Sequence, residues 1–297
     1  MKAVGTHEVR VVSMVGRLRR VLLKHPREAF VDAQRIEGQW RALGFLGPPD
    51  LETAAREFDR FTTMLAEEGV ETLLLPRDDG TGLDSLYTHD PLFVLGRGAV
   101  LCRPGKEARR GEPAAVKRFL EQAGVPILGA IEGAGCLEGG DILILDEHTL
   151  AVGEGYRSNA EGIRQLRALL GPEIEDVIPV PLPHWKGPSD VLHLQSLISL
   201  LDRDLALVHS PLLPVPFRER LRARGCRLLE LPPEELDTLG CNVLALAPQR
   251  CLVVEGNPRT RRLLQKAGVE VLAFEGREIA FKGCGGPTCL TRPLLRD

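Results

Sequence analysis

This chain of 297 residues lacks the features of a membrane-spanning, nucleic-acid-binding or disulfide-bonded protein. No apolar run reaches the roughly 18 residues of a membrane-spanning helix, and no charged-then-apolar signal pattern opens the sequence. The net charge of −3 gives no general attraction to nucleic acid or to an anionic membrane. The seven cysteines are an odd number without regular disulfide spacing, so we expect reduced thiols and a cytoplasmic protein.

What the chain does contain is a repeated order of strand, turn, strand, helix and strand. The copies span residues 91–128, 141–180, 196–231 and 242–274, with a looser copy at 17–75. The helix of each copy ends at a glycine, which suits a left-handed C-terminal cap. These glycines are Gly69, Gly124, Gly171, Gly225 and Gly268. Because one such unit cannot bury its apolar face alone, five of them predict a closed ring and a single α/β domain over residues 1–297.

Reactive polar side chains follow the last strand of each unit. They are Asp84 and Asp90, then Glu138 and Asp141, then His193, then Asn242, and finally Cys284 and Cys289. In a ring these loops would converge on one pocket. Carboxylates, a histidine and a cysteine together are typical of a covalent cysteine active site for a cationic substrate.

Cys289 is the candidate nucleophile of this pocket. It lies in KGCGGPTCLTRPLL, where glycines permit tight backbone geometry beside the thiol. The alternative is a buried structural cysteine, which is the usual place of a free thiol. Cys284 would pair with Cys289 or bind a metal, but the spacing and the lack of a second Cys/His pair argue against zinc.

His193 is the candidate acid and base. A neutral imidazole beside a thiol takes and returns a proton near pH 7. A lone histidine is more often a surface or core residue, but the place of His193 after the third repeat favours the pocket. His89, next to Asp90, and His184, in a proline-rich turn, are the competing histidines.

The acidic residues of the first two loops are either solvated surface groups or pocket groups. Their loops carry little other charge, and a buried carboxylate needs a cation. No lysine-rich loop supplies such a cation, whereas a guanidinium substrate would, through paired hydrogen bonds.

Asn242 is expected to have a supporting structural role.

Two arginines precede repeat helices. Arg109 and Arg157 are either solvated capping residues or residues that bind a substrate carboxylate at the far end of the pocket.

The long connection at 27–51 is the largest irregularity of the repeat. It is either a flap over the pocket or a surface excursion packed on the ring, and both readings stay open.

Five motifs in order resemble the guanidino-group-modifying enzymes, the pentein superfamily. The motifs are DSLYTHDP, LEGGD, YRSNAEG, LHLQS and GGPTC. Within that superfamily the chain is most similar to dimethylarginine dimethylaminohydrolases and to arginine deiminases. The resemblance implies a five-bladed α/β propeller of ββαβ units with pseudo-fivefold symmetry. Two residues depart from the family pattern: His89 stands where dimethylargininases have a glutamate, and Thr288 stands where many deiminases have a histidine.

The resemblance also implies roles for single residues. Cys289 matches the nucleophile, His193 the acid and base, and Glu138 the carboxylate that binds the guanidinium. The remaining predicted substrate contacts are Asp84, Asp90, Asp141, Arg109 and Arg157.

The implied activity is hydrolysis at the guanidino carbon of arginine or a methylated arginine, giving citrulline and an amine or ammonia. No cofactor or metal is expected, and a small guanidino compound is the expected partner, with a homodimer possible. The alternatives are an amidinotransferase, in which an amine replaces water, and a non-catalytic propeller that binds a macromolecule.

Overall fold

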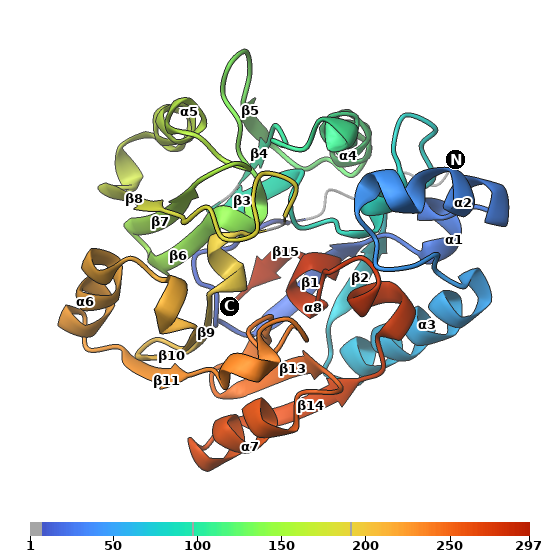
Figure 1. Cartoon of the computed structure of the whole chain (residues 1–297). Coiled ribbons are helices and arrows are strands. Elements are labelled where there is room, and N and C mark those ends of the chain that lie inside the picture. Colours follow the sequence, from blue (N-terminus) through green and yellow to red (C-terminus); the bar gives the residue numbers. More distant parts are fainter. Residues whose placement is uncertain (1–7, 97, 191) are drawn as a thin grey trace.

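The computed structural model describes residues 8–96, 98–190 and 192–297. Its strands form five three-stranded sheets, with the orders β15-β1-β2, β3-β4-β5, β6-β7-β8, β11-β10-β9 and β12-β13-β14. In every sheet the middle strand pairs antiparallel on one side and parallel on the other. Figure 1 shows the sheets following one another around the centre of the molecule, with the longer helices on the outside.

The elements have the following bounds. The strands are β1 (Leu18–Leu23), β2 (Glu71–Leu74), β3 (Leu92–Leu95), β4 (Gly98–Leu101), β5 (Ile127–Ala130), β6 (Ile142–Asp146), β7 (Thr149–Glu154), β8 (Asp176–Pro181), β9 (Ile198–Asp202), β10 (Leu205–Val208), β11 (Arg227–Glu230), β12 (Leu244–Ala247), β13 (Arg250–Val254), β14 (Glu270–Phe274) and β15 (Arg292–Arg296). The helices are α1 (Pro26–Ala29), α2 (Ala33–Leu43), α3 (Leu51–Glu67), α4 (Glu112–Gln122), α5 (Ala160–Leu170), α6 (Val215–Ala223), α7 (Pro258–Lys266) and α8 (Pro287–Leu290).

Four of the five predicted units have the predicted element order. In each, a hairpin is followed by a helix and a third strand parallel to the second strand of the hairpin. The glycines predicted to end the helices all have positive φ, between 67° at Gly124 and 95° at Gly268. This backbone region costs glycine little because it has no Cβ atom. The local pattern therefore predicted these units correctly.

The unit at the N-terminus is built differently from the prediction. Its sheet takes β15 from the C-terminal end of the chain, and β15 pairs antiparallel with β1. The connection at 27–51, expected to be a flap over the pocket or a surface excursion, contains α2 and most of α1. Asp32 caps α2 by accepting a hydrogen bond from the Arg35 N–H, and Gly44, at φ 80°, ends it.

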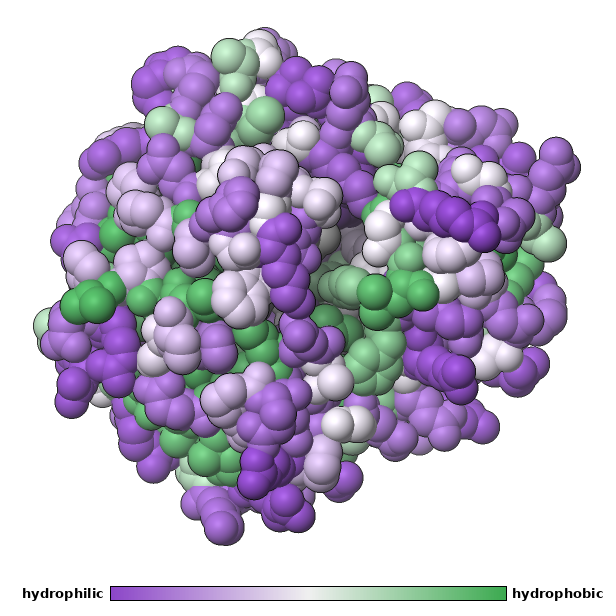
Figure 2. Space-filling view, viewed as in Figure 1, coloured by the Kyte–Doolittle hydropathy of each residue, from purple (hydrophilic) through white to green (hydrophobic). Residues whose placement is uncertain are grey.

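The core lies between the sheets and the helices that cover them. One example is the contact of α3 with β14, where the rings of Phe61 and Phe274 lie 4.8 Å apart. Figure 2 shows hydrophilic residues over much of the surface and a hollow near the centre of the face seen in Figure 1. Among the helices of the described ranges, none is long and apolar enough to cross a membrane.

Candidate active site

Five of the predicted polar residues occupy equivalent positions in the five sheets. Each lies shortly before the first strand of a sheet: Asp90 before β3, Glu138 before β6, His193 before β9, Asn242 before β12 and Cys289 before β15. Because the sheets surround one centre, equivalent positions come close together. The predicted convergence of the loops is confirmed for these residues by the contacts described below.

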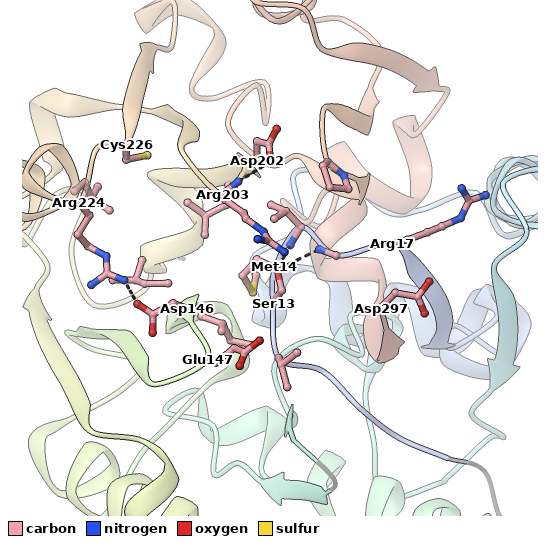
Figure 3. Close-up of a pocket in the computed structure, with 18 of the residues that line it drawn as sticks. Ser13, Met14, Arg17, Asp146, Glu147, Asp202, Arg203, Arg224, Cys226 and Asp297 are labelled. Carbon is pink, nitrogen blue, oxygen red and sulfur yellow. Dashed lines mark hydrogen bonds and ion pairs between the residues drawn. The ribbon is translucent and has the colours of Figure 1, made fainter.

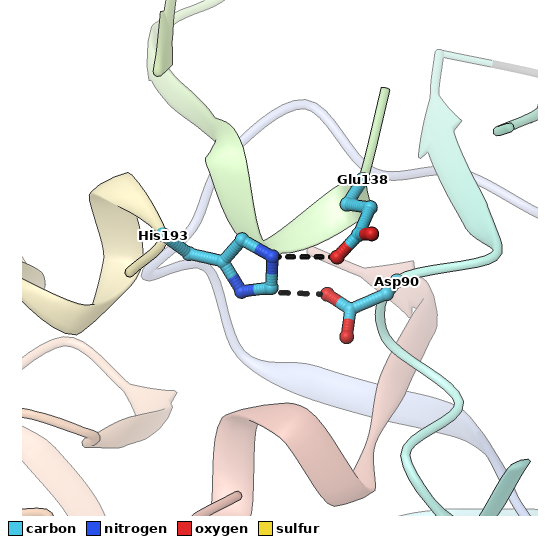
Figure 4. Close-up of side chains that lie close together, drawn as sticks. All are labelled: Asp90, Glu138 and His193. Carbon is cyan, nitrogen blue, oxygen red and sulfur yellow. Dashed lines mark hydrogen bonds and ion pairs between the residues drawn. The ribbon is translucent and has the colours of Figure 1, made fainter. Parts of the chain in front are cut away.

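His193 lies between two carboxylates in the buried part of the site (Figure 4). Its Nε2 is 2.7 Å from Oε2 of Glu138, and its Nδ1 is 3.9 Å from Oδ1 of Asp90. All three side chains are buried. Burial opposes a charge on the ring, but the surrounding carboxylates outweigh it, so the pKa of His193 is raised.

Gly140 allows the side chains of Asp90 and His193 to approach the turn that precedes β6. The Gly140 N–H donates to Oδ1 of Asp90 at 3.0 Å. A Cβ atom on Gly140 would lie 2.5 Å from Nδ1 of His193, which is too close for any side chain. Only glycine at this position lets the turn pass beside the imidazole.

The two carboxylates are held in the ionised form. Burial alone would raise the pKa of Glu138, but the Arg157 guanidinium and the hydrogen bond to His193 lower it to about 2. Burial likewise opposes ionisation of Asp90, but the charges of His193 and Arg109 hold its pKa below the usual range. The site is therefore anionic around the imidazole.

Asp141 lies beside the turn that carries His193. It is predicted to contact substrate, but, like Glu138, it is fully buried and is not among the residues that line the cavity described below. Its carboxylate accepts hydrogen bonds from the Ser158 hydroxyl at 2.6 Å and from the Leu194 N–H at 2.9 Å. Burial raises its pKa to about 6. These contacts hold the turn that carries His193, so Asp141 positions that ring from behind.

Cys289 lies on α8, and Asn242 holds it there. The Asn242 Nδ2 donates to Sγ of Cys289 at 3.1 Å, while its Oδ1 accepts from the Thr288 N–H at 3.0 Å. Burial and, to a lesser degree, the charge of Asp90 raise the pKa of Cys289 to about 12, although the Asn242 hydrogen bond opposes this. Without a cation beside it, the side chain is a neutral thiol at pH 7.

The protein itself supplies cations to these carboxylates, contrary to the sequence-based argument. The Nε of Arg157 donates to Oε1 of Glu138 at 2.9 Å. Arg109 forms an ion pair with Asp90 through Nη1. Asp84, the other acidic residue of the first loop, is paired as well, because its Oδ2 lies 2.6 Å from Nζ of Lys106.

Glu112 and Tyr87 belong to the same network and were not predicted. Arg109 donates from Nη2 to Oε2 of Glu112 at 2.8 Å and to the Tyr87 carbonyl at 2.9 Å. Burial raises the pKa of Glu112 to about 7, and the Arg109 charge limits that rise. The spacing of three residues between Arg109 and Glu112 is the signal that would have found this pair.

A metal ion is the alternative occupant of this cluster. Ligand atoms of Asp90, Glu138 and His193 lie within 4.8 Å of one another, and this is the metal-compatible group found in the described ranges. Both carboxylates, however, already bind arginine guanidinium groups. That positive charge disfavours a divalent cation, so a metal-free site stays our prediction.

The thiol and the imidazole line a cavity with two lobes. The smaller lobe, about 100 Å³, contains Asp84, Asp90, Arg109 and Arg157 among its lining residues. The larger lobe, about 450 Å³, is lined partly by apolar side chains. His193, Cys289, Cys284 and Asp190 line both lobes.

The competing histidines lie outside this cavity. His89 is buried, with Nδ1 2.7 Å from the Thr291 carbonyl and Nε2 3.2 Å from the Gln195 amide. Burial and, secondarily, the Arg292 charge lower its pKa to about 3. His184 is exposed and contacts the Tyr156 hydroxyl at 2.8 Å. Cys284, in contrast, does line the cavity.

A second, larger cavity of about 690 Å³ contains none of the predicted site residues (Figure 3). Charged side chains of both signs line it, among them Arg17, Arg203, Asp146 and Asp202. Arg224 is already paired with Asp146. Cys226 and Ser13 line this cavity, but no histidine is among its lining residues. A thiol and an imidazole line one cavity together at the site of Cys289 and His193.

A family model described as "N,N dimethylarginine dimethylhydrolase, eukaryotic" matches residues 50–296. The match covers the site residues named above and most of the chain. The chain belongs to the dimethylarginine dimethylaminohydrolase family.

Curated relatives agree with membership of this family. A dimethylarginine dimethylaminohydrolase of Streptomyces coelicolor is 35% identical over 240 residues, which cover 80% of this chain and 84% of the relative. An arginine deiminase of Listeria welshimeri is 28% identical over 259 residues, which cover 72% of this chain and 62% of the relative. Like these relatives, the family member described here is a hydrolase that acts on carbon–nitrogen bonds.

Solved structures agree on the fold. The dimethylarginine dimethylaminohydrolase of Pseudomonas aeruginosa, as a cysteine-to-serine mutant complexed with citrulline, has a TM-score of 0.73 at 25% identity. The match covers 95% of this chain and all of that one. An amidinotransferase from Microseira wollei has a TM-score of 0.79 at 17% identity, covers 97% of each chain, and shows the fold alone. The five small mixed sheets are thus those of the pentein fold.

Proposed function

We propose that this protein hydrolyses the guanidino group of arginine or a methylated arginine to citrulline and an amine or ammonia, through a covalent amidino-thioether on Cys289. The observation that carries the proposal is the single cavity lined by Cys289, His193, Asp90 and the two arginines. The geometry supports a thiol, an acid and a cation-binding carboxylate acting on one carbon atom.

Substrate binding requires an exchange of ion pairs. The guanidinium of the substrate takes the place of the protein's own guanidinium groups at Glu138 and Asp90. Arg157 and Arg109 then turn toward the carboxylate of the substrate, since both line the smaller lobe. Every buried charge keeps a partner, so the exchange avoids the cost of an isolated ion. Asp84, paired with Lys106 on the same lobe, stays a predicted contact of the substrate.

Substrate charge activates the nucleophile. With a pKa of about 12, Cys289 is protonated in the free enzyme. A guanidinium beside the sulfur stabilises the thiolate, so the thiol proton is lost to solvent when substrate binds. The same positive charge makes the central carbon electrophilic. The enzyme thus becomes reactive only when a cationic substrate is bound.

His193 then moves the protons. The carboxylates around it raise its pKa and so favour the protonated ring, which can protonate the departing amine. The carbon–nitrogen bond breaks and leaves an amidino-thioether on Cys289. His193 next takes a proton from water, whose oxygen attacks the same carbon, and release of the sulfur gives the ureido product.

Two solved structures support this scheme. One is the Pseudomonas aeruginosa enzyme, as its cysteine-to-serine mutant, complexed with citrulline. The other is the adduct of a histidine-to-glycine variant of a dimethylarginine dimethylaminohydrolase with S-methyl-L-thiocitrulline, 26% identical to this chain with a TM-score of 0.73. We further propose that the five sheets are the blades of one propeller domain over residues 1–297, as the repeat predicts.

The test compares two cysteine variants with the wild type. Arginine, monomethylarginine and dimethylarginine are assayed for ureido product, and the intact mass is recorded after treatment with an amidine analogue of arginine. We expect Cys289→Ser to abolish turnover and adduct formation, whereas Cys284→Ser keeps the adduct. Wild-type turnover by Cys289→Ser would refute the scheme. Product formation only when ornithine or glycine is added would identify an amidinotransferase instead.

A further inference from the structure

We propose that the larger lobe of the cavity binds an apolar substituent on the guanidino nitrogen that leaves, so that this enzyme prefers guanidino compounds with a group bulkier than methyl. The inference rests on the proposed function, because it assigns the two ends of the substrate around Cys289. It names a substrate class, guanidino compounds with a large apolar N-substituent.

The two lobes differ sharply in charge. The smaller lobe carries Asp84, Asp90, Lys106, Arg109 and Arg157. The larger lobe is lined mainly by apolar side chains, Leu46, Trp185, Leu192, Leu236, Leu239 and Phe281, and its charged residues are Lys186, Asp237 and the shared Asp190. Its Lys186 and Asp237 form an exposed ion pair of 2.7 Å with each other, so they leave the apolar wall intact.

This difference assigns the ends of the substrate. Cys289 and His193 line both lobes, so a carbon atom bound at the sulfur adjoins both of them. The charged amino-acid end fits the smaller lobe, because both arginines, which would pair with its carboxylate, line that lobe. The substituent on the guanidino group is then directed into the larger lobe.

The larger lobe is too spacious for methyl groups. Its volume of about 450 Å³ falls within the roughly 300–1,000 Å³ of pockets that hold a whole small molecule. A methyl group would leave most of the apolar wall in contact with water. A longer alkyl or an aromatic group would cover it, and burial of apolar surface is favourable.

Backbone strain is also concentrated at this lobe. In the described ranges, the non-glycine residues with positive φ are Val31, Trp185, Leu239, Gln249 and Cys284. Three of these five line the larger lobe: Trp185 at 41°, Leu239 at 65° and Cys284 at 58°. Strained backbone persists mainly where surrounding structure or function requires it. The lobe is therefore a formed feature of the site.

The chemistry of the proposed substrate balances without a co-reactant. The bond from the central carbon to the substituted nitrogen breaks, and His193 protonates that nitrogen as it leaves. Water supplies the oxygen that enters citrulline and returns a proton to His193. The products are citrulline and a primary amine that carries the apolar group.

The experiment measures kcat/KM for Nω-methyl-, Nω-propyl- and Nω-benzyl-L-arginine through both citrulline and amine release. We expect kcat/KM for the propyl or the benzyl compound to exceed that for the methyl compound, and equal values for all three would contradict the preference. Leu236→Trp fills the lobe and should lower the ratio of propyl to methyl kcat/KM by about tenfold or more. The matched control, Leu74→Trp, changes a half-exposed leucine of β2 outside both lobes and should leave the ratio unchanged.

The possible outcomes separate the inference from the proposed function. If the enzyme forms citrulline from methylarginine but not from the propyl and benzyl compounds, the inference is wrong and the proposed hydrolase function is still supported. An equal loss on all substrates in Leu236→Trp also overturns it, because that variant would then act through general damage. Turnover of none of the compounds, with intact folding, overturns the proposed function and the inference together.

Discussion

At the scale of single residues, the carboxylates around His193 raise the pKa of its ring. Glu138 makes the direct hydrogen bond of 2.7 Å, and Asp90 lies on the other side of the ring. Their charges raise the pKa of His193 although burial lowers it. An acid that must protonate a leaving amine near pH 7 benefits from this arrangement.

Replacement of Glu138 by glutamine tests this arrangement. Glu138→Gln removes one negative charge from beside the ring, so the pKa of His193 should fall and kcat should drop by about 10²-fold or more. An NMR titration of the labelled histidine ring measures the first effect, and the ureido assay measures the second. Glu67→Gln, on the exposed face of α3, is the control. An unchanged His193 titration in Glu138→Gln would contradict the prediction.

A second histidine prediction concerns stability. Because its pKa is lowered to about 3, His89 stays neutral when folded, whereas an unfolded histidine binds a proton below about pH 6.5. The unfolded state therefore takes up the extra proton, and stability falls as the pH drops from about 6.5 toward 3. The limiting slope is about 1.4 kcal/mol per pH unit for this one group.

His89→Gln should remove that dependence. Urea unfolding of the wild type and the variant at pH 7.5, 5.5 and 4.5 gives the comparison. We expect the stability difference between the two proteins to shift in favour of the variant as the pH falls. His184→Gln, on the surface, is the control for the substitution itself. Parallel pH curves for His89→Gln and the wild type would rule out the buried neutral imidazole.

At the scale of elements, the turns before the first strands of the sheets carry the site. The turn Gly139–Asp141 brings Gly140 against His193, with a hypothetical Cβ atom 2.5 Å from Nδ1. In α2, by contrast, a Cβ atom on Gly38 would meet nothing within 4 Å. The two glycines therefore form a matched pair for alanine substitution.

Gly140→Ala should displace the imidazole and lower kcat by about 10²-fold, since catalysis is sensitive to shifts of about 1 Å. Gly38→Ala should stabilise the protein by roughly 1 kcal/mol, because alanine favours a helix interior over glycine. Thermal unfolding and the ureido assay on both variants check these effects. Full activity of Gly140→Ala would show that the turn has room to shift.

At the scale of the whole molecule, β15 joins the end of the chain to β1. Leu294 of β15 is fully buried. Arg296 adds hydrogen bonds from Nη1 to the Gly16 carbonyl at 2.6 Å and from Nη2 to the Ala245 carbonyl at 2.8 Å. Because β15 also follows Cys289 directly, closure of this sheet and placement of the nucleophile depend on the same segment.

Leu294→Ala should lower the free energy of unfolding by about 2–5 kcal/mol through loss of buried apolar contacts. Leu74→Ala, in the same sheet but half exposed, should change it by less than about 0.5 kcal/mol. Urea denaturation followed by fluorescence and circular dichroism measures both variants. Coincident transitions would support the single domain, and separate transitions would contradict it.

Particular residues show where prediction from sequence succeeded and where it did not. The strands, hairpins and glycine caps follow from local periodicity, and the structure has them in the predicted places. Asn242 was expected to be structural, and its amide holds both Cys289 and the Thr288 N–H. Glu112, Tyr87 and Gln195 were missed, because their importance comes from contacts with the site and not from any motif of their own.

The sequence by itself determined the repeated unit and the reactive residues, because strand pairing within a unit, helix caps and catalytic motifs are local in the chain. Only the tertiary structure decided that β15 completes the first sheet and that Asp141 supports the histidine turn. It also decided that Arg109 and Arg157 form ion pairs with Asp90 and Glu138. The division of the cavity into a charged lobe and a mainly apolar lobe likewise came from the tertiary structure. The physical reason is that burial and ion pairing depend on which distant segments meet, which no local pattern specifies.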